Sequence, residues 1–189
     1  MKIGNILYFS PKHKFIDLDL EDKEKLIDAF EERVKGYYLI PAEEIVGKHV
    51  FASGVLCVST MDYLAKLESG SEKVKERFVT WTKNNIEGLN KADPDNVSST
   101  LAYRFYNEFR NGLVHECRIK NAGQFSFNYP ELDRIIDGVM IINPKYLLNE
   151  IKKSFDRYLE IVNKDDFTLQ ALKCTLINDF RSDFEALNR

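Results

Sequence analysis

The chain has 189 residues, of which 44% are apolar and 30% are charged. These fractions are ordinary for a soluble globular protein, and a chain of this length can bury a core without a disulfide or a metal ion. Its 27 basic and 30 acidic residues give a net charge of −3. That balance excludes a strongly basic nucleic-acid clamp as the overall design, but not a local basic site.

Helical spacing of apolar residues predicts most of the first half of the chain as helix. A first helix is expected over 20–35 and should stop at Gly36, because glycine favours helix C-termini. A second helix is expected over 41–68, and its wide apolar face indicates burial on most sides. Gly47 and Gly54 lie inside this helix and would be tolerated where another helix packs closely against it.

The second half of the chain mixes helix with a short β segment. Apolar residues at every fourth position predict a helix over about 96–115. Alternating residues on both sides of Asn121-Ala-Gly123 predict a short hairpin over 117–127, and the pattern of 135–142 suits a third strand. Further helices are expected over 71–86, 144–162 and 167–187.

These elements sum to a mainly α protein, an antiparallel helical bundle with a small β-hairpin or sheet insertion after the fourth helix. We expect a single domain over 1–189. Within it, residues 1–40 form an N-terminal extension with the first helix, and residues 117–142 form the β insertion.

The cysteines and histidines do not indicate a metal or redox site. Cys57, Cys117 and Cys174 are widely spaced and form no C-x-x-C pair, and the three histidines are dispersed. The amino terminus lacks the small-residue cleavage site of a secretory signal, and the longest apolar run, 50–61, is shorter than a membrane span. We therefore expect a cytoplasmic protein with reduced thiols, no cofactor and no membrane association.

One segment concentrates residues that suit catalysis. At the end of the fourth predicted helix the sequence reads RNGLVH, which places Arg110, Asn111 and His115 within six positions. Histidine titrates near neutral pH and can take a proton from a 2′-hydroxyl or give one to a leaving oxygen. A guanidinium group can hold two oxygens of a phosphate, so these residue types suit RNA cleavage without a metal.

The helical spacing of these residues restricts how they can meet. Asn111 and His115 share a helix face, whereas an offset of five places Arg110 and His115 about 140° apart on a straight helix. Three arrangements would bring them together: the long arginine side chain, a distortion at Gly112, or a residue from a partner chain.

This segment resembles the HEPN superfamily (higher eukaryotes and prokaryotes nucleotide-binding), many of whose members carry R-x(4–6)-H with Asn, Asp or His after the arginine. The resemblance covers the motif and its helical context, residues 43–160. It implies a metal-independent endoribonuclease that works as a homodimer, with the motifs of two chains forming one composite site. Arg110 and His115 would then be catalytic and Asn111 would assist. A toxin or defence role, with an antitoxin or another partner protein, would fit this family.

Basic and aromatic residues surround the motif. Arg104, Arg118, Lys120 and Tyr106 could hold an RNA backbone and stack a base. Two other hypotheses stay open beside the ribonuclease. The chain could be a non-catalytic HEPN-like module that binds RNA, a nucleotide or a protein, or an unrelated helical scaffold. In the scaffold, the motif arginine and histidine would be buried in ion pairs within one chain.

Overall fold

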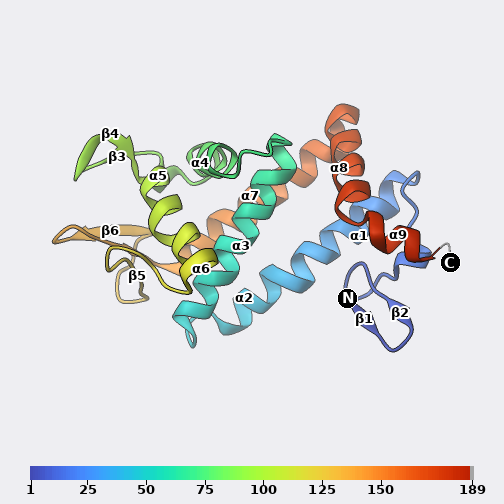
Figure 1. The fold of residues 1–189 in the computed structure, drawn as a ribbon, viewed down its shortest axis with the longest axis horizontal. Coiled ribbons are helices and arrows are strands. Elements are labelled where there is room, and N and C mark those ends of the chain that lie inside the picture. The colour runs from blue at the N-terminus through green and yellow to red at the C-terminus, as the bar shows by residue number, and fades with distance from the viewer. Residues whose placement is uncertain (188–189) are drawn as a thin grey trace. The chain divides into compact units, whose positions relative to one another are not determined.

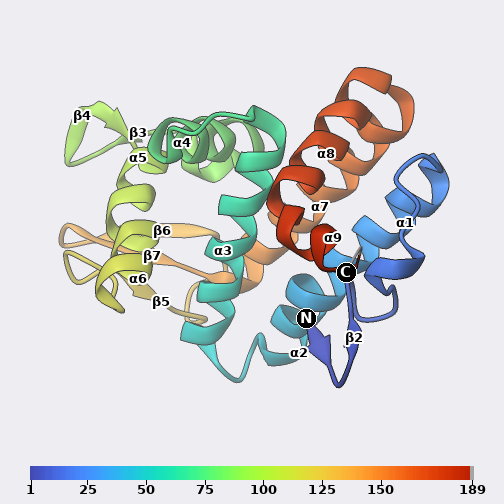
Figure 2. The same cartoon turned by 45° about the vertical axis from the view of Figure 1, so that its right-hand side comes forward.

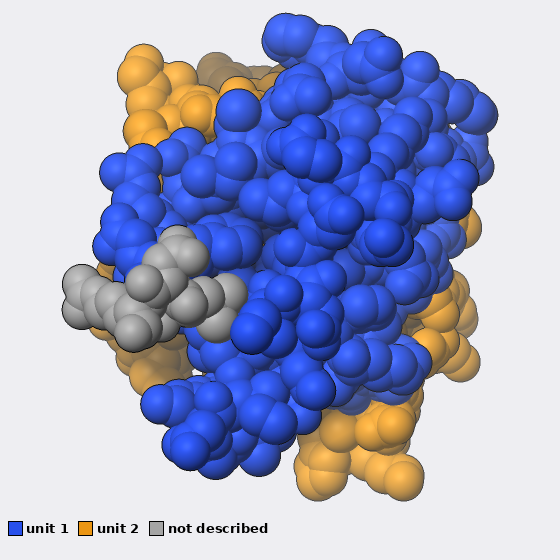
Figure 3. Space-filling view, turned by 90° about the vertical axis from the view of Figure 1, so that its right-hand side faces the viewer, with its two compact units in different colours: residues 1–41, 155–189 blue, residues 42–154 orange. Residues whose placement is uncertain are grey.

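The computed structural model describes residues 1–187 and is mainly α-helical with small sheets, one of which follows the fourth helical region (Figure 1). The predicted fold class is therefore confirmed. The chain divides into two compact units, coloured separately in Figure 3. One unit contains residues 1–41 and 155–189, and the other contains residues 42–154. All seven residues singled out around the motif belong to the second unit.

The first unit is built from both ends of the chain around a cluster of aromatic rings. Phe9, Phe15 and Phe180 lie edge to face with centroids 5.4–5.6 Å apart, and the guanidinium group of Arg33 lies over the rings of Phe9 and Phe180. These rings join the N-terminal segment to the C-terminal helices. The elements are β1 (Lys2–Ile3), β2 (Ile6–Leu7), α1 (Lys23–Val34), the π-helical turn η2 (Lys35–Leu39), the end of α7 (Pro144–Lys164), α8 (Asp166–Asp179) and α9 (Arg181–Leu187).

The prediction that the first helix stops at Gly36 is wrong. The π-helical turn carries the backbone through Gly36 into α2 (Ile40–Ile45). A Cβ at Gly36 would lie 2.6 Å from Cγ of Pro11, so this glycine allows a close approach and does not end the helix. The predicted last helix is also divided, since α8 ends before Phe180 and α9 begins after it.

The second unit surrounds the motif helix with two helices and a small sheet (Figures 1 and 2). A row of rings runs through it: Phe105 stacks between Phe78 at 6.2 Å and Phe109 at 4.8 Å, and Phe109 lies 5.1 Å from Phe125. The elements are α3 (Val50–Ser69), α4 (Val74–Asn85), η3 (Glu87–Leu89), β3 (Ala92–Asp93), β4 (Asn96–Thr100), α5 (Leu101–Phe105), the π-helical turn η4 (Tyr106–Arg110), α6 (Asn111–Glu116), β5 (Gln124–Phe125), β6 (Asp133–Ile136), β7 (Val139–Ile142) and the first part of α7.

The predicted second helix is two helices, because the backbone breaks at Gly47, where φ is +94°. The second glycine in that prediction, Gly54, is contacted by a strand and not by a helix: a Cβ there would lie 2.3 Å from the ring of Phe125 in β5. Among the described residues, α3 alone is long and apolar enough to cross a membrane, with a mean hydropathy of 1.3. Core helices of soluble proteins pass the same test, and 50% of its apolar window is buried in the protein.

The β segment differs from the predicted hairpin. Residues 117–123 form a tight loop in which Cys117, Asn121 and Ala122 have positive φ, so they cannot be a strand. The hairpin is instead β6–β7, which turns at Asp137-Gly138, two residues with the positive φ that a tight hairpin turn requires. β5 joins the other edge of β7 in parallel, giving the order β5-β7-β6.

The fourth predicted helix begins at Leu101, five residues after its predicted start. Asn96–Thr100 pairs with β3 as a strand, and helix begins at Leu101 because the Thr100 side chain accepts a hydrogen bond from the backbone N–H of Tyr103.

Gly54→Ala is expected to destabilise the second unit, because the added Cβ would overlap the Phe125 ring. Overpacking a core costs about 1–3 kcal/mol, whereas replacing a helical glycine with alanine recovers about 1 kcal/mol. We expect a lower urea midpoint for Gly54→Ala than for the wild type, and no change for Ser59→Ala at an exposed position of the same helix. An unchanged midpoint for Gly54→Ala would contradict the close approach.

Candidate functional site

The motif lies on a helix that contains a π-helical turn. The turn, Tyr106–Arg110, passes directly into α6, where Asn111 to Glu116 follow ordinary α-helical geometry and Cys117 ends the helix with φ of +54°. Arg110 is the last residue of the distorted turn, and Asn111 and His115 lie in the regular helix that follows it. Gly112 lies in regular helix, so the structure contains no distortion there that would bring the two side chains together.

The Arg110 side chain extends toward α3. Its Nη2 donates a hydrogen bond to Oδ2 of Asp62 at 2.8 Å, and its side chain is 11% exposed. Its Nη1 has no acceptor among the described residues and is not fully buried, whereas its Nε is buried without a partner. The guanidinium group is therefore fixed through one nitrogen while another can still donate.

His115 and Asn111 lie one helical turn apart on α6. His115 is exposed and makes no hydrogen bond or ion pair with any residue that the structure describes; Asn111 is half-buried. No contact within the described chain joins His115 to Arg110. The arrangement expected of an inert scaffold, with both residues buried in ion pairs, holds for Arg110 alone.

Arg104, predicted to bind nucleic acid, is occupied inside the protein. Its side chain is 9% exposed; Nε donates to Glu108 at 2.9 Å, and Nη1 donates to Asp95 at 2.7 Å and to Asp93 at 3.2 Å. Nη2 donates to the carbonyl oxygen of Gly138. Burial alone would lower the pKa of Arg104, but the hydrogen bonds to Asp95 and Glu108 outweigh it and the pKa is raised. Arg104 therefore links α5 to the strands and is not free to bind RNA.

Tyr106 is also unavailable for stacking on a base. It is buried, with its ring 5.6 Å from that of Phe78 and beside the Arg110 guanidinium group at 6.0 Å. The sequence places it beside basic residues, but the row of aromatic residues in this helix faces the core.

Arg118 and Lys120 remain near the surface, and both form an ion pair with Glu116 at 2.6 Å. The Lys120 hydrogen bond, together with Arg118, lowers the pKa of the Glu116 carboxyl group. The loop that carries them packs directly on α6, since a Cβ at Gly112 would lie 2.3 Å from the carbonyl oxygen of Arg118. Arg118 is exposed and Lys120 is half-buried, and Glu116 neutralises part of their charge; their predicted contact with phosphate stays a prediction.

Sequence reasoning missed two residues that contact this site, Asp62 on α3 and Arg77 on α4. Arg77 Nη2 lies 3.8 Å from Oδ1 of Asp62, so one carboxylate faces two arginines. A signal for Asp62 was present, because it is the only Asp, Glu, Lys or Arg between Lys48 and Lys66 in an otherwise apolar helix. A lone carboxylate in such a helix indicates a buried partner of opposite charge.

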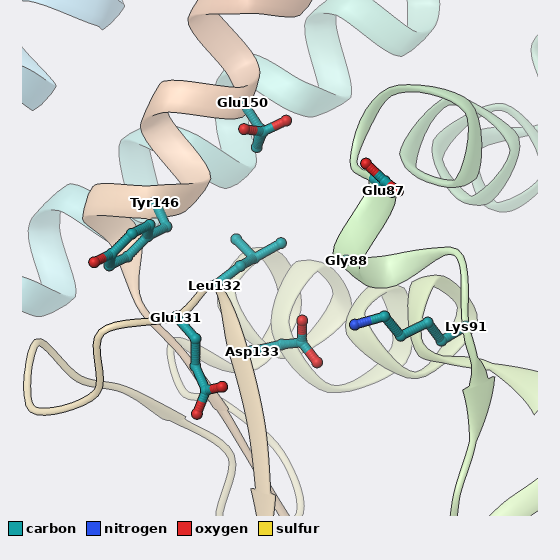
Figure 4. Close-up of a pocket in the computed structure, with 8 residues that line it drawn as sticks. All are labelled: Glu87, Gly88, Lys91, Glu131, Leu132, Asp133, Tyr146 and Glu150. Atoms are coloured by element: carbon teal, nitrogen blue, oxygen red, sulfur yellow. The ribbon is translucent and has the colours of Figure 1, made fainter.

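A separate cavity of about 360 Å³ lies where η3, β6 and the start of α7 meet (Figure 4). No motif residue lines it. In Figure 4, Lys91 extends toward Asp133 among several carboxylates. Burial raises the pKa of Asp133, against the opposing effect of Lys91. Within residues 1–187, no group of three or more His, Cys, Asp or Glu side chains is placed to hold a metal ion. The lining residues are Glu87, Gly88, Lys91, Glu131, Leu132, Asp133, Tyr146 and Glu150.

Comparison with known proteins found no matching family model, no similar curated protein and no similar solved structure.

Arg104→Met is expected to lower the free energy of unfolding by about 3–5 kcal/mol, because it leaves buried Asp93 and Glu108 without their cation. The matched control is Arg134→Met, which removes an exposed ion pair with Glu131 and should cost about 0–1 kcal/mol. Urea unfolding measures both. A loss below 1 kcal/mol for Arg104→Met would contradict the structural role.

Asp133→Asn is expected to stabilise the protein at pH 7 but not at pH 3. Because burial raises the pKa of Asp133 in the folded state, its ionised carboxylate is less stable there than in the unfolded chain. Ionisation of Asp133 as the pH rises therefore lowers the free energy of unfolding. Removing the charge should therefore raise the thermal midpoint at pH 7, and the difference should disappear at pH 3. Glu87→Gln, at an exposed carboxylate of the same cavity, is the control. An equal gain at both pH values would exclude the ionisation as the cause.

Proposed function

We propose that this protein is a metal-independent endoribonuclease of the HEPN type, working as a homodimer. The observation that carries the proposal is the state of Arg110: Asp62 fixes its guanidinium group through Nη2 and leaves Nη1 open, on the helix that also presents Asn111 and exposed His115. A fixed cation with a free donor and an accessible base, both on one helix, are two of the groups that phosphodiester cleavage requires.

The chemistry follows from these groups. A neutral His115 takes the proton from an RNA 2′-hydroxyl, and the resulting 2′-oxygen attacks the adjacent phosphorus. The bond from phosphorus to the 5′-oxygen breaks, and that oxygen receives a proton from a protonated imidazole. Arg110 Nη1 stabilises the charge that accumulates on the phosphate oxygens, and Asn111 donates a further hydrogen bond. The products are a 2′,3′-cyclic phosphate and a free 5′-hydroxyl.

In this proposal a second chain supplies the second histidine, because one chain has only one histidine at the motif. Within one chain, Arg110 ends the π-helical turn and His115 lies five positions later in α6, and no contact among the described residues joins the two side chains. His115 is exposed beside Val114, an apolar side chain that is 57% exposed. Two copies facing each other through this end of α6 would place two histidines near one phosphate, one to accept and one to donate a proton. RNA is the substrate of this proposal, and a partner protein such as an antitoxin would cover the same surface.

Cleavage of a mixed RNA pool in EDTA tests the proposal. We expect His115→Gln to lower the rate about 100-fold or more, Arg110→Ala to lower it by about 100- to 1,000-fold, and Asn111→Ala to lower it less. His49→Gln and Arg134→Met change an exposed histidine and an exposed arginine elsewhere in the second unit and should leave the rate unchanged. Circular dichroism and light scattering establish that every variant is folded and dimeric.

Two results would contradict the ribonuclease. Equal cleavage by all variants would indicate a contaminant or another site. No cleavage by a dimeric wild-type protein that still binds RNA would favour the non-catalytic binding module.

A further inference from the structure

Asp62 is shared between two arginines that come from different helices. Arg110 reaches it from η4 at 2.8 Å and Arg77 reaches it from α4 at 3.8 Å. The side chains are largely buried, at 11% exposed for Arg110, 10% for Arg77 and 24% for Asp62. Neither arginine pairs with another acidic residue that the structure describes, so the cluster has one positive charge in excess.

The hydrogen bonds of Arg77 leave Nη2 without an acceptor, and its Nε is buried without a partner. Its Nη1 donates to the carbonyl oxygen of Ser71 at 3.0 Å, which fixes the guanidinium group at the start of α4. Its Nη2 faces Asp62 beyond hydrogen-bond distance and is not one of the buried atoms that lack a partner. Nη2 of Arg77 and Nη1 of Arg110 are therefore both open, on two guanidinium groups that contact the same carboxylate.

A comparison with Arg104 distinguishes this cluster from a structural ion pair. Every guanidinium nitrogen of Arg104 donates to an acceptor in the chain, and three carboxylates surround its one positive charge. Around Asp62 the ratio of carboxylates to guanidinium groups is reversed, because one carboxylate faces two guanidinium groups that keep open donors. Two like charges in a largely dehydrated position are unfavourable unless an anion offsets them.

We propose that Arg77 and Arg110 together bind one phosphate group of RNA, while the Ser71 carbonyl oxygen holds the Arg77 guanidinium group and Asp62 holds that of Arg110. Two open guanidinium donors match the oxygens of a phosphate, and the excess charge matches its single negative charge. This inference rests on the proposed function, because it identifies a second residue that holds the substrate at the Arg110 site. It makes Arg77 a binding residue, although nothing in the sequence around it resembles the motif.

The test measures binding apart from cleavage. The probe is a fluorescent RNA oligonucleotide with methylated 2′-hydroxyls, which cannot be cleaved by attack of the 2′-oxygen. Anisotropy gives its affinity for the full-length wild type, Arg77→Met, Arg77→Lys and the control Arg134→Met over a range of salt concentrations. Arg110 still neutralises Asp62 in the Arg77 variants, so we expect them to fold, which circular dichroism checks.

We expect Arg77→Met to weaken binding about 10-fold and to reduce the slope of log affinity against log salt by about 0.7, the value for one lost phosphate contact on a single strand. Arg77→Lys should fall between Arg77→Met and the wild type, and Arg134→Met should match the wild type. Binding of Arg77→Met and Arg77→Lys within twofold of wild type, with an unchanged slope, would overturn the proposal.

Two further results separate this proposal from the proposed function. Wild-type protein that binds the probe through Arg77 but does not cleave RNA would keep the phosphate site and reject the ribonuclease. Inorganic phosphate that raises the thermal midpoint of wild type but not of Arg77→Met, with no binding of the probe, would overturn RNA as the source of the phosphate.

Discussion

The row of rings that joins α4, α5, η4 and β5 is the constraint on which the second unit depends. Phe105 and Phe109 lie four positions apart on one helix and fill the space between Phe78 and Phe125. With these side chains directed into the core, the helix has one orientation in which its polar residues meet acceptors. Arg104 then meets the carboxylates near the strands, and Arg110 meets Asp62 on α3.

A π-helical turn separates the two contacts, since Arg104 precedes it and Arg110 is its last residue. A π turn adds one residue to a helical turn and shifts the side chains that follow it around the axis. Tyr106, Glu108 and Phe109 are buried inside this turn, while Arg110 leaves it toward α3. A distorted helical turn is kept where the surrounding packing stabilises it, and such turns are frequent at functional sites. Here the distortion lies directly before the motif.

Helical periodicity identified most of the helices, because a 3.6-residue repeat of apolar residues persists through them. It failed where local geometry decided the outcome. Val97 has the spacing of a buried helical residue but is exposed on a strand, and the Thr100 cap sets the true start of the helix. Gly36 allows the approach of Pro11, a contact between residues distant in sequence that no local pattern predicts.

At the candidate site too, the sequence shows which residues are present, but only the packing shows which of them have their hydrogen bonds satisfied. Arginines 104, 110 and 77 are indistinguishable as residue types, and the near-neutral net charge does not separate them. Their surroundings do, because three carboxylates enclose Arg104 while Arg77 and Arg110 share one. An arginine with surplus acceptors stabilises the fold, whereas arginines with too few acceptors keep donors for an anion. The local ratio of carboxylates to guanidinium groups, rather than the number of basic residues near a motif, is therefore the difference on which the proposed phosphate site at Arg77 and Arg110 rests.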